Sequence, residues 1–116
     1  MSLQTACELL KDIDAVEREG DRGKVTKSFL RKVVELIEKC DTKEEFLLSV
    51  AYMVARNKKY DEDDLVKFYR RLKEQIKKLG EDNWKKELRE IMQNTIKLYY
   101  VKAENLFEED LLCKTK

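Results

Sequence analysis

The residues of this chain best suited to chemistry are lysines and arginines gathered in three segments. The first lies in residues 24–32, where spacings of three, four and one put the cations on one outward face of a helix. The second follows at residues 56–59, and the third is spread over residues 67–78. Clustered cations attract the phosphate backbone of a nucleic acid without reading its bases. The candidate phosphate-binding residues are Lys24, Lys27, Arg31, Lys32, Arg56, Lys58, Lys59, Lys67, Arg70 and Arg71.

The overall charge neither supports nor excludes this interpretation. The 116 residues include 25 basic and 24 acidic ones, a net charge of +1, so attraction for a polyanion must come from local clustering. A chain in which 42% of the residues are charged shows local stripes in any case, and acidic neighbours can balance them in space. Two arrangements therefore remain open. The clusters converge if the second and fourth predicted helices are neighbours, or carboxylates neutralise them.

The composition excludes several kinds of catalysis. With no histidine, the chain has no imidazole base, no Ser-His or Cys-His pair and no histidine metal ligand. The acidic run at residues 61–64 lacks the alternating ligands, central glycine and twelfth-position glutamate of an EF-hand, so we interpret it as the start of a helix. No phosphate-binding glycine loop is present. We therefore expect a protein that is not an enzyme and that holds no cofactor or metal.

The three cysteines, Cys7, Cys40 and Cys113, are far apart and form no C-x-x-C pair. This pattern is unlike a disulfide framework or a zinc site, so we expect reduced cysteines packed as small apolar side chains. The first residues lack the apolar core of a signal peptide, and no apolar run is long enough to span a membrane. Together these features favour the cytoplasm. Heavy use of lysine and glutamate, without histidine, resembles the composition of thermophilic proteins.

Few residues in the chain favour turns. It has no proline and three glycines, whereas an all-β fold needs many turn residues and a doubly wound α/β fold needs several β-branched strand runs. Apolar residues instead recur at three- and four-residue spacing. We predict an all-α fold, a single domain over residues 1–116 built as a bundle of about five antiparallel helices. Residues 105–116 are a candidate frayed tail.

Turn and capping residues divide the apolar stripes into five predicted helices. Gly20 and Gly23 break the chain after the first helix. Thr42 forms a capping box ahead of the third helix with the glutamate three residues later, and Asp61 caps the fourth. Gly80 is suited to the position just after the fourth helix. The predicted ranges are 3–18, 26–40, 43–56, 61–79 and a last helix from 82 or 83 that continues to about 107.

Three tyrosines, Tyr52, Tyr60 and Tyr100, fall off the apolar stripes. Their rings are therefore available for base stacking or for contact with another subunit. The other aromatic side chains of the predicted helices lie on the stripes, where we expect them to pack in the core.

Three segments carry a resemblance to a known family. Residues 24–32 read KVTKSFLRK, residues 48–56 read LSVAYMVAR and residues 95–102 read TIKLYYVK. In order and spacing they resemble segments of the small helical (Csm-type) subunit of type III-A CRISPR–Cas effector complexes. Phe29 and Ala55 stand where that family usually has glutamine and glycine, and the histidine that closes its last segment is missing here. The small subunit of type III-B (Cmr) complexes is another helical bundle of similar size, so membership of either type remains open.

The resemblance implies a non-catalytic subunit of a CRISPR RNA-guided complex for antiviral defence. Such a subunit stacks with copies of itself and with other subunits, and it contacts the backbone of crRNA and single-stranded target RNA. Lys27, Arg31, Lys32 and Arg56 match the family pattern for this contact. The other six candidate cations rest on charge clustering alone. No membrane contact is implied.

Two other functions fit the same sequence. One is a helical protein–protein adaptor with no nucleic-acid role, which docks on a partner through the apolar residues Leu106, Phe107, Leu111 and Leu112. The other is a DNA-binding regulator, although the predicted turns lack the usual tight spacing before a polar recognition helix. Binding that falls steeply with salt would distinguish RNA contact from apolar docking.

Overall fold

The computed structural model describes residues 2–15, 22–106 and 113. Within these ranges the chain forms five helices and no strand, so the prediction of an all-α bundle is confirmed. The helices are α1 (Ser2–Leu10), α2 (Lys27–Lys39), α3 (Lys43–Asn57), α4 (Asp64–Lys77) and α5 (Trp84–Ala103).

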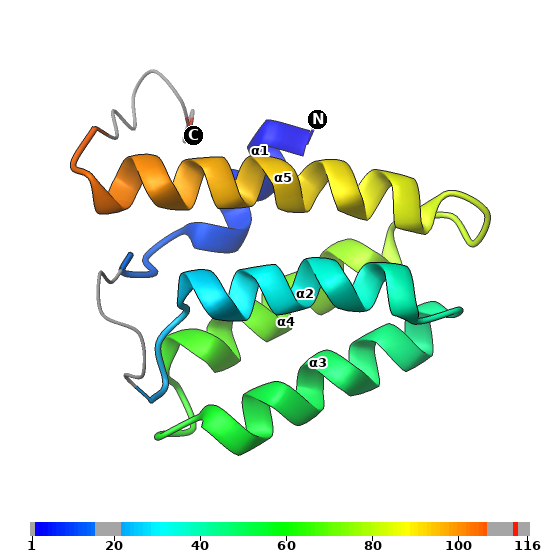
Figure 1. The fold of residues 1–116 in the computed structure, drawn as a ribbon, viewed down its shortest axis with the longest axis horizontal. Coiled ribbons are helices and arrows are strands. Elements are labelled where there is room, and N and C mark those ends of the chain that lie inside the picture. The colour runs from blue at the N-terminus through cyan, green and yellow to red at the C-terminus, as the bar shows by residue number, and fades with distance from the viewer. Residues whose placement is uncertain (1, 16–21, 107–112, 114–116) are drawn as a thin grey trace.

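From α2 to α5, each helix runs antiparallel to the one before it (Figure 1). In this view α2 lies between α5 and α3, and α4 lies behind, packed on α3. The short α1 crosses behind α5 and also contacts α4. Short connections favour this arrangement, because a few residues reach only the nearest end of the next helix. The first half of α2 therefore lies beside the last half of α3.

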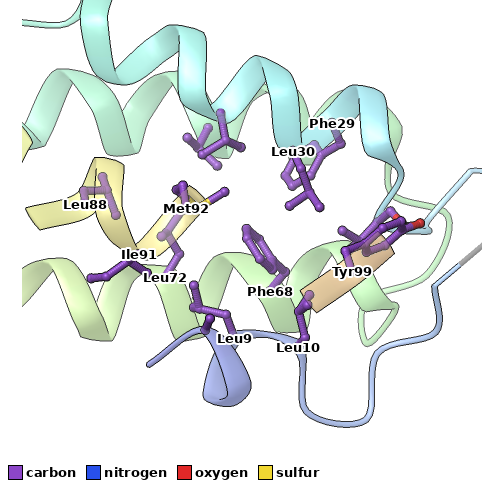
Figure 2. Close-up of a cluster of buried hydrophobic side chains, with 14 of the residues drawn as sticks. Leu9, Leu10, Phe29, Leu30, Phe68, Leu72, Leu88, Ile91, Met92 and Tyr99 are labelled. Carbon is purple, nitrogen blue, oxygen red and sulfur yellow. The ribbon is translucent and has the colours of Figure 1, made fainter. Parts of the chain in front are cut away.

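The predicted apolar stripes form the core, part of which is shown in Figure 2. The rings of Phe29 and Phe68 pack edge to face with their centroids 5.6 Å apart, which joins α2 to α4. Phe46 of α3 and Trp84 of α5 lie 5.8 Å apart. Removing a buried ring of this size costs roughly 3–5 kcal/mol, so these contacts fix the relative positions of the helices firmly.

The start of α2 is held at two points. The hydroxyl of Thr26 accepts a hydrogen bond of 3.1 Å from the backbone N–H of Phe29 and so caps the helix. The helix therefore begins next to the predicted start at residue 26. The buried Tyr99 of α5 donates its hydroxyl to the carbonyl of Val25 over 2.7 Å. The segment that leads into α2 is therefore fixed against α5.

The predicted capping box of α3 forms only in part. Thr42 accepts from the N–H of Glu45 over 3.1 Å, and the Glu45 carboxylate accepts from the N–H of Asp41 over 3.0 Å. The second bond therefore goes to the residue before the cap, not to the cap itself.

The cap of α4 is Asp63, so the prediction of Asp61 is wrong. The Asp63 carboxylate accepts from the N–H of Val66 at 3.2 Å in the first turn of the helix. It also accepts from the N–H groups of Lys59 at 2.7 Å and Tyr60 at 3.1 Å. One carboxylate therefore closes the preceding turn and also accepts from an N–H group of the first helical turn. For this reason the helix begins at Asp64 and not earlier.

The first helix ends at Leu10, well before its predicted end at residue 18. Asp12 takes the left-handed conformation with φ 58°, which stops a helix and which aspartate tolerates better than most residues. The ammonium of Lys102 donates to the carbonyls of Leu10 at 3.4 Å and Ile13 at 2.8 Å. A partner on another helix thus satisfies the freed carbonyls. Residues 16–18 of the predicted helix lie outside the described residues.

The fifth helix ends at Ala103, so its predicted continuation to residue 107 is wrong. Asn105 is left-handed with φ 60°, and the N–H of Leu106 donates to the carbonyl of Val101 over 2.9 Å. This backward bond is a common way to satisfy the carbonyls at a helix end, with asparagine in place of glycine.

A disulfide joins Cys7 of α1 to Cys113, with 1.98 Å between the Sγ atoms and 5.7 Å between the Cα atoms. The expectation of three reduced cysteines is therefore wrong for this pair, whereas Cys40 is free and buried. The bond spans 106 positions of sequence and fixes Cys113, from the predicted frayed tail, against the first helix. The other residues of that tail after Leu106 lie outside the described residues.

Gly23 links the end of α3 to the start of α4. Its N–H donates to the carbonyl of Asn57 at 2.9 Å, and its carbonyl accepts from the N–H of Leu65 at 3.2 Å. Its φ of +82° is a conformation that other residues rarely adopt, and a Cβ here would lie 2.6 Å from the Asp63 carboxylate. At Gly80, by contrast, an added Cβ would meet nothing within 4 Å and φ is not left-handed, so the helix-ending role predicted for this glycine is not used.

Gly80 is a matched control for a test of Gly23 and its link between α3 and α4. We expect Gly23→Ala to lower the free energy of unfolding by about 1–3 kcal/mol, because the new Cβ adds backbone strain and crowds a helix cap. Gly80→Ala should change it by less than about 0.5 kcal/mol. Urea unfolding followed by circular dichroism measures both. Equal stability of the two variants would contradict the role assigned to Gly23.

Candidate nucleic-acid interface

A basic groove of about 360 Å³ lies between α2 and α3. We call it the α2–α3 groove. Four of its lining side chains are cationic. No carboxylate lies among the described lining residues. The groove therefore presents positive charge to solvent without a negative partner in its wall. Its lining residues are Arg22, Lys24, Thr26, Ser28, Phe29, Lys32, Tyr52, Met53, Arg56, Asn57 and Leu65.

The antiparallel packing of the two helices builds the groove. On α2, Ser28 and Lys32 are four residues apart and so lie on one flank, one turn from each other. On α3, Tyr52 and Arg56 have the same spacing, and the Arg56 guanidinium lies 5.6 Å from the centre of the Tyr52 ring. Figure 1 shows that α3 runs back along α2. Both pairs therefore line the same groove.

The floor of the groove is apolar and rigid. Phe29 and Leu65 are buried there, and the former is locked against Phe68 of α4. Thr26, another lining residue, is held as well, because its hydroxyl accepts a hydrogen bond from the backbone N–H of Phe29. The floor is therefore preformed, whereas the exposed cations of the walls lose side-chain freedom when a ligand binds.

Three cations of the groove carry no ion pair among the described residues: Arg22, Lys32 and Arg56. Lys24 is different, because its ammonium lies 3.6 Å from Asp14 and 4.0 Å from Asp64. Arg22 donates to the backbone carbonyl of Lys58 at 3.5 Å and keeps its charge unpaired there. Lys32 and Arg56 are therefore the two cations best placed to meet an anionic ligand.

Two predicted cations lie outside the groove and are paired with carboxylates. Lys58 lies 2.9 Å from Asp61, and Arg70 lies 3.1 Å from Glu62. The hydrogen bond from Lys58, together with its charge, lowers the pKa of Asp61, so this carboxylate stays ionised in mildly acidic solution. Each carboxylate reduces the attraction of its partner cation for a phosphate.

Lys27 and Arg31 occupy the other flank of α2, toward α5. The Lys27 ammonium lies 4.4 Å above the ring of Tyr100, and the Arg31 guanidinium donates to the Tyr100 hydroxyl. One residue step turns a helix by about 100°, so this flank is distinct from the groove flank that holds Lys32. The first basic segment thus supplies cations on two sides of α2.

The remaining candidates are separate from the groove. Lys59 lies 5.5 Å from the ring of Tyr60, and Lys67 on α4 makes no ion pair in the described ranges. Arg71 donates to the backbone carbonyl of Lys11, where it helps to close the end of α1. Of the ten candidates, the structure brings three together in the groove: Lys24, Lys32 and Arg56.

Sequence reasoning missed Arg22, which lies beside Gly23 in a segment interpreted only as a break between helices. The one available signal was its nearness to the basic segment that begins at Lys24. Its place in the groove depends on Gly23, whose N–H donates to the carbonyl of Asn57 and so holds Arg22 near the end of α3.

Comparison of the chain with protein-family models, curated proteins and solved structures returns no match. Among the described residues, no three side chains of the His, Cys, Asp or Glu type form a potential metal site. No helix in the described ranges has the length and apolar character needed to cross a membrane. The fold and the site together define the class as a helical bundle with a preformed cationic groove.

Proposed function

We propose that this protein is a non-catalytic, RNA-binding small subunit of a type III CRISPR RNA-guided effector complex. The observation that carries the proposal is the α2–α3 groove, whose described lining holds four cations and no carboxylate. Its proposed ligand is the backbone of crRNA and single-stranded target RNA. Its proposed partners are the other subunits of the complex and further copies of the chain.

The geometry supports phosphate contact in a specific way. Lys32 and Arg56 are 24 positions apart in sequence but line the same groove, and both match the segments that resemble the Csm-type subunit. Exposed cations on helix flanks bind phosphate oxygens whatever the base, which suits a complex in which guide pairing selects the sequence. The flank with Lys27 and Arg31 offers a second, weaker contact beside it.

We propose the cytoplasm as the compartment of this subunit. The disulfide removes the argument from reduced cysteines, because such bonds are rare in most cytosols. Intracellular proteins of hyperthermophiles are an exception and are rich in disulfides. The lysine- and glutamate-rich composition, with no histidine, fits that exception.

The second candidate function is a protein–protein adaptor, and one observation favours it. Leu106, just beyond α5, is 68% exposed, as an apolar docking residue would be. The other apolar residues proposed for this contact lie outside the described residues, so the adaptor rests on a single side chain.

Salt dependence of RNA binding tests the proposal against the adaptor. If the four groove cations each neutralise a phosphate of a single strand, the slope of log affinity against log salt is about −2.8. The affinity then falls about 50-fold between roughly 50 and 200 mM salt. Fluorescence anisotropy with labelled RNA measures it. The absence of RNA binding at the lower salt concentration would sink the proposal and leave the adaptor.

A further inference from the structure

We propose that the α2–α3 groove holds an unpaired nucleotide whose base stacks on Tyr52 while its phosphate meets Lys32 and Arg56. This inference rests on the proposed function and deepens it, because it states which form of RNA the groove accepts. It predicts a preference for single strands over duplexes that phosphate contact alone does not give.

The exposure of Tyr52 is the first observation. Its side chain is 60% exposed, whereas Phe29, the other aromatic residue of the groove, is only 8% exposed. An exposed ring beside cations is the combination by which proteins bind single strands, since every base has a face that can stack. The ring needs no partner for folding, so a base can cover it without breaking a core contact.

The position of Arg56 is the second observation. Its guanidinium lies 5.6 Å from the centre of the Tyr52 ring, near the outer limit of about 6 Å for a cation–π contact. One helical turn thus places a stacking surface next to a phosphate-binding group. The base and the phosphate of one nucleotide are separated by a comparable distance. A single nucleotide can therefore contact both the Tyr52 ring and the Arg56 guanidinium.

The size of the groove is the third observation. A volume of about 360 Å³ lies near the lower end of the range for small-ligand sites, which suits one nucleotide. A duplex cannot use the Tyr52 ring, because its bases are stacked on one another and present only their edges. It would touch the rim of the groove through phosphates alone.

A second apolar side chain on α3 offers a control. Leu48 lies one turn before Tyr52 and is 73% exposed, but it is not part of the groove lining. If Tyr52 served a protein contact on the outer face of α3, Leu48 would belong to the same surface. Its substitution therefore separates a docking face from a base-stacking site.

The test compares Tyr52→Leu, Tyr52→Phe and Leu48→Ala on the full chain. The probes are an oligouridylate of about 12 nucleotides, which matches the site size of single-strand binders, and a blunt RNA duplex without unpaired nucleotides. We expect Tyr52→Leu to weaken binding of the oligouridylate by about 5- to 150-fold, the cost of one lost stack, without effect on binding of the duplex. Tyr52→Phe and Leu48→Ala should stay within about twofold of the wild type.

The possible outcomes separate this inference from the proposed function. Tyr52→Leu with wild-type affinity for the oligouridylate overturns the inference, as does equal weakening for both probes or an equal effect of Leu48→Ala. Wild-type binding by the double variant Lys32→Glu/Arg56→Glu overturns the proposed function itself. Emission from the buried Trp84 reports whether each variant is folded.

Discussion

Reversing the charge of both Lys32 and Arg56 is expected to lower the affinity for single-stranded RNA on the order of 100-fold at low salt. Each contact of a cation with a phosphate contributes about 1.5 kcal/mol, and about 1.4 kcal/mol corresponds to a factor of ten. Both side chains line the groove and have no carboxylate partner in the described structure, so no carboxylate competes with the ligand for their charge. Lys24 contributes less because Asp14 and Asp64 already lie near it.

The salt slope gives a second measure of the same change. Loss of two phosphate contacts on a single strand should reduce the slope by about 1.4. The loss of affinity should be the same for oligouridylate and oligoadenylate, because phosphate contacts carry no sequence information. Anisotropy titrations at several salt concentrations measure all of these quantities.

The control for this variant is Lys73→Glu/Lys78→Glu. Both lysines are exposed on or just after α4, and neither lines the groove. The change in net charge is identical, so any general electrostatic effect appears in both variants. Equal loss of RNA affinity in the two would show that the groove has no special role.

The helices and their buried faces could be predicted from the sequence because burial imposes a period that the residues must follow. Leu72, Leu88 and Met92 are fully buried on the stripes where periodicity placed them. The helix ends were less predictable. The three aspartates of the acidic run at residues 61–64 can each cap α4, and only the turn at Lys59 and Tyr60 selects Asp63.

The candidate site was predictable only in part. Charge clustering could identify Lys32 and Arg56 as separate candidates, but their meeting depends on how α3 folds back along α2. Charge clustering could not predict that Asp61 pairs with Lys58 or that Glu62 pairs with Arg70. Both pairs depend on the conformation of the turn before α4. Local sequence therefore indicates which cations exist, whereas tertiary packing decides which of them are available.

The disulfide had no signal in the sequence. Cys7 and Cys113 are 106 positions apart, and three widely spaced cysteines allow several pairings or none. The pairing arises because α1 packs against α5 and Cys113 lies buried at that side of the bundle. Proximity of the two ends in the fold, not spacing, creates the bond.

Opening this disulfide should have the largest effect on stability. In the chain-entropy model a closed loop of about 100 residues stabilises the native state by about 4.7 kcal/mol, since it restricts the unfolded chain. We expect Cys7→Ala/Cys113→Ala to lose about 4 to 5 kcal/mol, a large part of the total for a single domain, and Tm to fall on the order of 15 °C. Thermal and guanidinium unfolding in the absence of reductant measure the loss.

Adding a reductant distinguishes the contribution of the cross-link to stability from that of the packing of the two side chains. Dithiothreitol should lower the Tm of the wild type toward that of the double variant and leave the variant unchanged, because only the wild type has a bond to open. Cys40→Ala is the matched control: it removes a buried thiol that closes no loop, so its stability should fall less and its response to reductant should equal that of the wild type. A wild type whose Tm does not change with complete reduction would contradict a stabilising cross-link between the ends of the bundle.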